Sequence, residues 1–248
     1  MTNNLAGLLA VAVAADPTRP LLTWYDDATG DRTELSGATL ANWVAKTANL
    51  VVDGAGAAAG DHADVALPAH WQTAGVLLGC WSAALVVRTA PAAGPGAPTG
   101  RDPLPALPDD PAAEVLFASP PAVPEVDRRP VGERYLLSLA PMAAPARELP
   151  PGWTDYITEV RGHGDHFTPY PAVDRQDAEL AGRARRRGAE LGIGAGARVL
   201  VDCDRYPDPT DWLLAPLAAE ATMVLCRNLD RQRLDGRVDS EKVDLVLA

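Results

Sequence analysis

The spacing of apolar and polar residues changes in the same order twice along this chain. From residue 40 onward apolar side chains keep helical spacing, a glycine-rich turn follows at residues 54–60, and residues 63–67 form a short apolar run typical of a buried strand. An apolar helix is then predicted over residues 71–84 and a strand over residues 85–87. Helix, glycine turn, strand, helix and strand is the order of a parallel α/β unit, because parallel strands need a long crossover.

The second copy of this pattern lies between residues 180 and 226. An amphipathic helix ends near residue 191, glycines follow, and residues 198–203 form a strand bounded by Asp204. Asp211 is predicted to cap a helix over residues 212–220, which leads into a strand at 222–226. Gly60 in the first copy matches Gly196 in the second. The pattern therefore predicts two related units.

The remaining segments extend these units. They are a helix at 5–15, a hairpin formed by 21–25 and 32–35 with Ser36 capping the next helix, strands at 114–118 and 134–139, a strand at 156–160 and a last strand at 243–248. We predict an α/β fold with two related, largely parallel lobes, residues 1–150 and 151–248, which together could form one compact domain. The proline- and glycine-rich residues 89–113 are expected to be a surface excursion of the first lobe.

Composition narrows the function classes. A net charge of −11, with one basic cluster at residues 183–187, argues against nucleic-acid binding. No run of 18 to 20 apolar residues is present, so we expect no membrane association, and cytoplasmic localisation is the default. The spacings of Cys80, Cys203 and Cys226 match no zinc or redox motif, so these residues are interpreted as core.

The order of elements, with Gly60-Asp61 before an apolar strand that ends at Pro68, resembles the start of the adenylate-forming superfamily of AMP-binding acyl-CoA synthetases. Residues 180–226 are similar to the segment that follows the phosphate loop in that family. The resemblance implies the stacked lobes of the family's N-terminal domain. It also implies an ATP-dependent reaction that activates carboxylates, with a second half of the fold supplying the adenine-binding and lid segments, before which this chain ends.

The segment matching the family's phosphate loop departs from its pattern. Where the family has a Ser/Thr- and Gly-rich loop ending in Pro-Lys, this chain has residues 158–169. The candidate cofactor-binding residues at this degenerate position are Thr158, Arg161, Gly162 and Gly164. Glu159 and Asp165 would face the polyphosphate, and neither Lys46 nor Lys242, the two lysines of the chain, matches the loop or lid lysine. We therefore assign no catalytic residue and expect no cofactor, with ATP or AMP disfavoured.

Three polar clusters have both a functional and a structural interpretation. His163, Asp165 and His166 could ligate a metal, but no further ligand is identifiable and a solvated loop is favoured, so we assign no metal site. A strand-end group could bind a cation or hydroxyl-bearing ligand, or supply turn and cap residues. The basic cluster could bind an anion, or form the solvated end of a helix. The strand-end group consists of Asp202, Asp204, Asp208 and Asp211. The basic cluster consists of Arg183, Arg185, Arg186 and Arg187.

Three functions remain open at this stage. The first is a non-catalytic relative of the AMP-binding enzymes, acting as a binding or interaction module. The second is a residual acyl- or nucleotide-binding subunit of a ligase that a separate chain completes. The third is a structural stub. In each case we expect a homodimer or a protein partner, because surface that the family's second half covers would be exposed.

Overall fold

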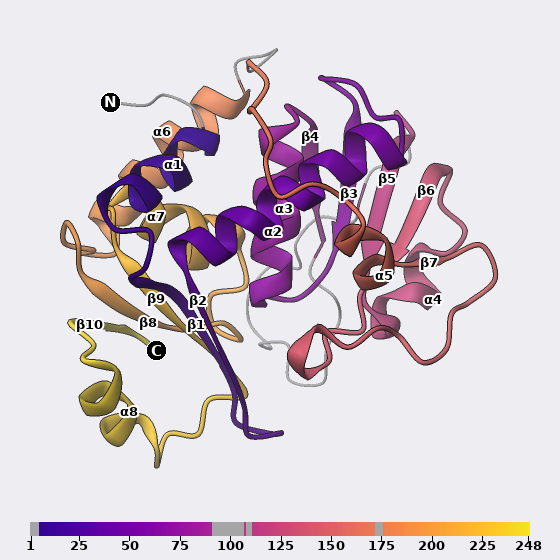
Figure 1. Ribbon diagram of the computed structural model, residues 1–248. Helices are drawn as coiled ribbons and strands as arrows, with labels where there is room; N and C mark the ends of the chain where they lie inside the picture. Colours follow the sequence, from indigo (N-terminus) through magenta and orange to yellow (C-terminus); the bar gives the residue numbers. More distant parts are fainter. Residues whose placement is uncertain (1–4, 91–106, 108–110, 172–175) are drawn as a thin grey trace. The chain divides into compact units, whose positions relative to one another are not determined.

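The computed structural model describes residues 5–90, 107, 111–171 and 176–248 (Figure 1). Within the chain, two compact units are distinguished. Unit 1 comprises Met1–Ala41, Ala69–Trp71 and Arg175–Ala248, and unit 2 comprises Asn42–Pro68 and Gln72–Asp174. This division differs from the expected boundary after residue 150, because the N-terminal hairpin pairs with a C-terminal strand and so belongs to unit 1.

Unit 2 is built on a sheet of five parallel strands in the order β4-β3-β5-β6-β7. The strands are β3 (His62–Ala66), β4 (Val86–Thr89), β5 (Ala113–Ala118), β6 (Val131–Leu136) and β7 (Thr154–Asp155). The helical elements that lie wholly or mostly in this unit are α2 (Gly37–Asn49), η1 (Leu50–Gly54), α3 (Trp71–Ser82), η2 (Pro120–Ala122), α4 (Val123–Val126), η3 (Pro141–Ala143) and α5 (Tyr156–Arg161). Most of the expected excursion at 89–113 lies outside the described residues.

Unit 1 has a five-stranded sheet in the order β10-β8-β9-β1-β2, in which only β2 runs antiparallel to its neighbour. The strands are β1 (Pro20–Asp26), β2 (Asp31–Ser36), β8 (Arg198–Asp202), β9 (Thr222–Arg227) and β10 (Leu245–Leu247). The helical elements are α1 (Leu5–Ala15), α6 (Gln176–Glu190), η4 (Thr210–Leu214), α7 (Ala215–Ala218) and α8 (Leu234–Glu241). The predicted fold class, α/β with two largely parallel sheets, is confirmed.

The internal repeat is present in the backbone itself. Gly60 and Gly196 have positive φ angles of 95° and 71°, and each donates its N–H to a carbonyl at the end of the following helix, on Ala84 and Ala219. Ala84 and Glu220 also match in position and have φ angles of 57° and 55°. In each unit the strand after the glycine lies between the next strand and a third, as β4-β3-β5 and β9-β8-β10. The two units thus share one βαβ plan.

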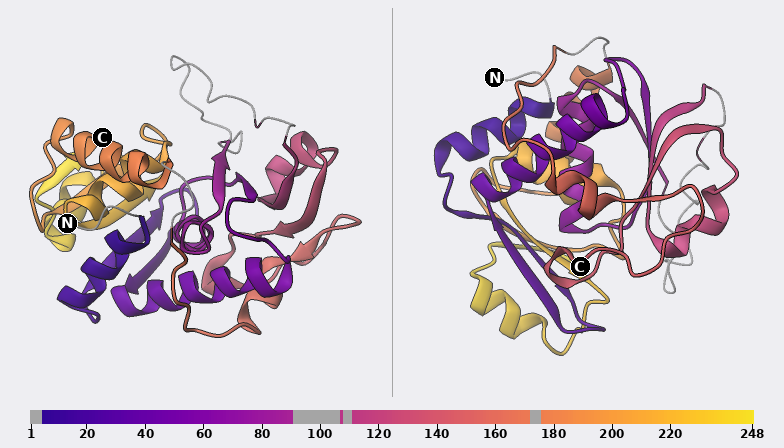
Figure 2. Two further views of the ribbon diagram at one scale, coloured as in Figure 1. Left: turned by 90° about the horizontal axis from the view of Figure 1, so that it is seen from above. Right: turned by 45° about the vertical axis from the view of Figure 1, so that its right-hand side comes forward.

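Both faces of the unit 1 sheet are covered. Val199, Leu200 and Val201 alternate between the faces of β8, and none is exposed to solvent. On one face Leu234, at the start of α8, and Val243, which follows that helix, pack against Leu200 and its neighbours. Helices α1, α6 and α7 pack on one another and lie on the other side of the sheet (Figure 2). Burial on both faces explains why β8 and β9 are continuous apolar runs rather than alternating ones.

Close contact between α2 and α3 in unit 2 depends on a glycine. A β-carbon at Gly79 would lie 2.6 Å from the β-carbon of Thr47, closer than two such atoms approach. The hydroxyl of Thr47 bonds the buried phenol of Tyr156 at 2.7 Å, and the Tyr156 ring meets Phe117 of β5 edge to face. This packing connects α5 to the centre of the sheet.

Two local predictions are wrong. Residues 156–160 form the helix α5 instead of a strand, because Tyr156, Ile157 and Val160 share one buried helical face. The helix expected over residues 212–220 is present as the π-helical turn η4 and the short α7, but its predicted cap is wrong, because Asp211 lies inside η4 and makes no capping hydrogen bond. Among the described residues no helix combines the length and the apolar character needed to cross a membrane.

A buried ion-pair network crosses the sheet of unit 2. Asp64, in the middle of β3, accepts from Arg88 Nε at 2.6 Å and from Arg129 Nη2 at 3.0 Å. Its side chain is 2% exposed, and those of the two arginines are 11% exposed. Removing one member of such a network leaves uncompensated charge in the interior.

We therefore expect Asp64→Asn to destabilise the protein by about 3 kcal/mol or more, since two buried guanidinium groups lose their counter-charge. Urea unfolding followed by circular dichroism measures the effect. Asp165→Asn, at an exposed position of the same unit, is the control. Equal midpoints for the two variants would contradict a buried charged network.

Candidate functional site

The helix α5 covers residues 158–161, the first part of the segment 158–169 that matches the family's phosphate loop. Asp155 is the N-cap of this helix, and its Oδ1 accepts from both the backbone N–H and the hydroxyl of Thr158, each at 2.7 Å. Its Oδ2 accepts from the N–H of Ala146 at 2.7 Å. One buried carboxylate therefore fixes the start of α5 and the loop that precedes it.

Of the four predicted cofactor-binding residues, Thr158 and Arg161 lie in α5 and the two glycines follow it. Arg161 Nη2 donates to the carbonyl of Ala143 at 3.0 Å, so its guanidinium supports the η3 loop. Gly162 is the C-cap, with φ −73° and ψ −16°, and its N–H bonds the carbonyl of Glu159. The structure brings these residues together along one helix and its cap.

The segment after α5 is held through its carbonyl groups. Lys46 Nζ donates to the carbonyl of His163 at 2.5 Å. Asn49 Nδ2 donates to the carbonyls of Gly164 and His166 at 2.9 and 3.0 Å. Both donors lie on α2, which places Lys46 against this segment as a structural donor.

This geometry differs from a phosphate cradle in its backbone donors. A cradle needs successive N–H groups that face outward toward phosphate oxygens. Here the N–H groups of Thr158, Gly162 and His163 bond Asp155, Glu159 and Val160. The exposed side chains of Glu159 and Asp165 add negative charge beside them. Binding a polyphosphate here would require these hydrogen bonds to break.

The possible metal ligands near α5 do not form a metal centre. Within the described ranges, no group of three or more His, Cys, Asp or Glu side chains is arranged to hold an ion. His163, Asp165 and His166 follow one another on the loop that α2 holds. The solvated-loop interpretation fits this placement.

A second polar region lies at the carboxyl end of the unit 1 sheet, where parallel α/β sheets commonly bind ligands. Asp26 ends β1, Asp202 ends β8, and Asp204 follows β8. Asn228, just after β9, donates its side-chain amide to Asp26 at 2.8 Å and its N–H to Asp204 at 2.6 Å. Burial raises the pKa of Asp204, and the charges of Asp202 and Asp26 raise it further.

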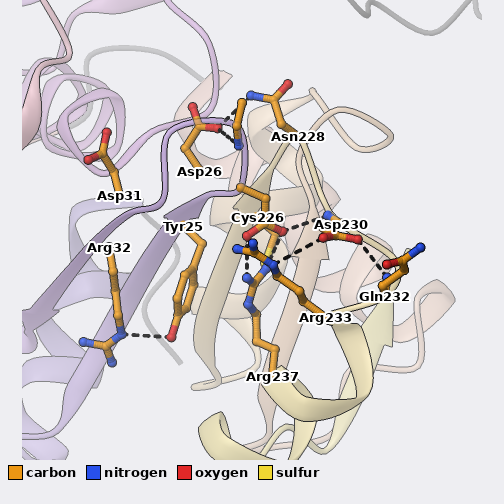
Figure 3. A network of polar contacts seen from close by, with 12 residues as sticks. Tyr25, Asp26, Asp31, Arg32, Cys226, Asn228, Asp230, Gln232, Arg233 and Arg237 are labelled. Carbon is orange, nitrogen blue, oxygen red and sulfur yellow. Dashed lines mark hydrogen bonds and ion pairs between the residues drawn. The ribbon is translucent and has the colours of Figure 1, made fainter.

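The adjacent network fixes α8 to the sheet (Figure 3). Arg237 of α8 donates Nη1 to Asp27 at 3.0 Å, pairs with its other oxygen through Nη2, and lies over the ring of Tyr25 at 4.2 Å. Its Nη1 also contacts Cys226 Sγ at 3.4 Å. Burial raises the pKa of this thiol to about 11, so Cys226 is a protonated core residue at neutral pH.

At its other end α8 is held by Glu241. The carboxylate accepts from Tyr25 at 2.5 Å, from Arg198 at 2.5 Å and from Arg32 at 3.0 Å. Burial alone would raise the pKa of Glu241, but hydrogen bonds from these three groups outweigh it and lower the pKa to about 2. Both carboxylate oxygens of Glu241 have donors. We call Glu241 and its three donors, Tyr25, Arg32 and Arg198, a structural clamp.

The predicted cluster of four aspartates is divided in the structure. Asp202 and Asp204 remain at the sheet end, whereas Asp208 accepts from the N–H of Thr210 at the start of η4 and Asp211 lies within η4. Asp211 bonds Arg187 of α6 at 2.6 Å instead of capping a helix. Arg187 also pairs with Glu190, so this arginine stabilises the contact between α6 and η4.

Asp26 and Asn228 at the sheet end were not predicted as site residues. They meet because β1 pairs in parallel with β9, from Leu22 against Met223 to Asp26 against Arg227. The sequence places the hairpin and β9 about 200 residues apart in different predicted lobes. The pairing could have been predicted from the apolar run 21–25, because the second predicted sheet had an edge strand without a partner.

Comparison with curated proteins places the chain in a family. A TIGR03089 family protein of Mycobacterium tuberculosis is 38% identical over 261 residues, which span 99% of this chain and 98% of the relative. The chain belongs to the TIGR03089 family. No family model matches the sequence.

Solved structures show the fold of this TIGR03089 family chain to be that of the N-terminal part of acyl-CoA synthetases. The acyl-CoA synthetase of Brucella canis superposes with a TM-score of 0.71 at 15% identity, over 98% of this chain and 46% of that one. The inhibitor-bound N-terminal domain of FACL13 from M. tuberculosis gives 0.69 at 13% identity, over 99% and 62%. Acetoacetyl-CoA synthetase from Streptomyces lividans gives 0.63 at 18% identity, over 90% and 38%. The chain thus spans less than two thirds of each of these structures.

The clamp around Glu241 predicts a specific acid dependence. Because the folded-state pKa lies below the ordinary value of a glutamate, its contribution is complete above that ordinary value and is lost as the pH falls toward 2. We expect Glu241→Gln to lower the thermal midpoint at pH 7 and to flatten its decline between about pH 4.5 and pH 2. Glu190→Gln, at a side chain that is 63% exposed, should change neither quantity. If the thermal midpoint of Glu241→Gln declined with falling pH as steeply as that of the wild type, the lowered pKa of Glu241 would be refuted.

The contact between Arg161 and Ala143 predicts a structural role for Arg161. We expect Arg161→Ala to lower the free energy of unfolding by about 1 kcal/mol, because the Ala143 carbonyl loses its donor. Chemical denaturation measures this, with Arg186→Ala at an exposed position of α6 as the matched control. Wild-type stability in the Arg161 variant would show that the guanidinium does not hold the loop.

Proposed function

We propose that this chain is a non-catalytic relative of the N-terminal domain of acyl-CoA synthetases and acts as a binding or interaction module. The observation that carries the proposal is that the first part of the segment matching the phosphate loop, residues 158–161, lies in α5, whose N-cap is Asp155. The N–H group of Thr158 that would face a phosphate is bonded to Asp155. The family membership and the fold support the relationship to acyl-CoA synthetases.

Charge at this position also argues against catalysis. Transfer of an adenylyl group develops negative charge that fixed donors must stabilise, and a single positioned donor is worth about 3 kcal/mol. The cations beside α5 are Arg161 and Lys46, and both donate to backbone carbonyls. Glu159 and Asp165 oppose binding of a polyphosphate. A phosphate loop would instead place positive charge beside the bound polyphosphate.

The competing function is a residual acyl- or nucleotide-binding subunit of a ligase that a separate chain completes. This chain aligns with 46% of the Brucella synthetase, so a complementary polypeptide could carry the rest of that fold. The two functions differ in whether the isolated chain binds a ligase substrate. A thermal-shift screen with ATP, AMP, CoA and acyl-CoAs separates them, because a ligand bound by the folded state raises the midpoint.

The module's partner is proposed to be a protein, with a second copy of the chain as the first to test. The η3 loop of unit 2 exposes Met142, and Leu149 on the same segment is 45% exposed. Apolar side chains at the surface of an acidic chain offer contact area without charge repulsion. Sedimentation velocity at tens of micromolar tests self-association, and a clean monomer would leave only a different protein as partner.

The isolated protein is expected not to adenylate carboxylates. Carboxylate-dependent pyrophosphate exchange and hydroxamate formation, measured over a broad panel of acids, should stay at background because the N–H groups of Thr158, Gly162 and His163 are bonded within the chain. Asp155→Ala, which releases the N–H of Thr158, should not create activity. Turnover that Arg161→Ala or Gly164→Pro abolishes would overturn the proposal and establish a divergent phosphate loop.

A further inference from the structure

A strained loop in unit 2 displays a methionine to solvent. Leu139, Met142 and Ala143 have φ angles of 56°, 57° and 50°, in the left-handed region that residues with a β-carbon rarely adopt. Met142 is 90% exposed, the highest value among the large hydrophobic side chains described as exposed. Strained residues persist where the surroundings hold them, and they cluster at functional positions.

The loop is held by its neighbours. Ala143 is buried, and its carbonyl accepts from Arg161 Nη2 at 3.0 Å. The hydroxyl of Ser138 donates to the carbonyl of Ala144 at 2.7 Å, and Asp155 accepts from the N–H of Ala146. None of these contacts uses the side chain of Met142. The backbone is therefore fixed independently of the thioether that it presents.

The second described methionine has the opposite environment. Met223 lies on β9, inside the sheet of unit 1, and is completely buried. The three cysteines are also buried, and burial raises the pKa of Cys80, Cys203 and Cys226, which keeps these thiols in their unreactive protonated form. Among the described sulfur atoms, that of Met142 is the one open to a reagent in solution.

We propose that Met142 is a modification site for peroxides, at which oxidation to methionine sulfoxide changes the polarity of the η3 loop without unfolding the protein. A lone pair of the thioether attacks one peroxide oxygen, so an S–O bond forms and the O–O bond breaks. Sulfur is oxidised by two electrons, and the other oxygen of hydrogen peroxide takes up a proton and leaves as water. The product is polar where the side chain was apolar, and methionine sulfoxide reductases reverse the step.

Peptide mass spectrometry of the native full chain treated with hydrogen peroxide tests this site. Cleavage after arginine places Met142 in peptide 135–147 and Met223 in peptide 206–227, where fragment ions distinguish Met223 from Cys226. We expect one added oxygen on the first peptide at a rate at least about tenfold above that of Met223. In denaturant the two rates should converge. Similar rates in the native protein would overturn the proposal.

Two controls make the result specific. Met142→Leu should remove the rapid oxygen uptake from peptide 135–147 and leave the thermal midpoint unchanged, because no described backbone contact of the loop uses the thioether. Wild-type protein oxidised at Met142 should also keep its midpoint and regain its original mass with a methionine sulfoxide reductase. A large drop in the midpoint at one oxygen per chain would show that the side chain supports the fold, contrary to the proposal.

Discussion

Parallel strand pairing is the constraint on which the rest of this structure depends. Neighbouring parallel strands cannot be joined by a tight turn, so each pair requires a long crossover, usually a helix, that returns the chain to the same end of the sheet. The chain meets this requirement twice with the same backbone device. A left-handed glycine starts β3 and β8, at Gly60 and Gly196, and a left-handed corner at Ala84 and Glu220 leads into β4 and β9. The two units are therefore related through the same pair of left-handed positions around a crossover helix.

The same constraint determines where polar chemistry can gather. Parallel strands end at one edge of a sheet, and the loops beyond them bring together residues that are distant in sequence. In unit 1 this edge collects Asp26, Asp202 and Asp204, yet the donors of Asn228 and the clamp around α8 satisfy the neighbouring groups from within the protein. In unit 2, Asp155 ends β7 and becomes a helix cap. At both sheet ends these carboxylates therefore make hydrogen bonds within the protein.

The sequence predicted those parts of the fold in which local signals and packing agree. The βαβ units, the hairpin and Ser36 as an N-cap all had explicit patterns, and the Thr39 N–H does bond the Ser36 hydroxyl at 3.2 Å. Tyr156–Arg161 was misassigned because Tyr-Ile-Thr-Glu-Val fits strand alternation, whereas the capping bonds of Asp155 and the burial of Tyr156, Ile157 and Val160 favour a helix. The pairing of β1 with β9 could not be read from local spacing, because it depends on which sheet edge is uncovered. The site prediction rests on a one-dimensional match, which could not show that the N–H groups of Thr158, Gly162 and His163 are bonded within the chain.

The proposal depends on the N–H groups of Thr158, Gly162 and His163 being bonded to acceptors within the chain. Amide resonances of Thr158, Gly162 and His163, recorded by nuclear magnetic resonance during a titration with Mg²⁺ and ATP, test it most directly. The account predicts that these resonances do not move at millimolar nucleotide, and that the N–H groups of Thr158 and Gly162 exchange slowly with solvent because they are bonded to Asp155 and Glu159. Saturable shifts concentrated at residues 158–164 would contradict it.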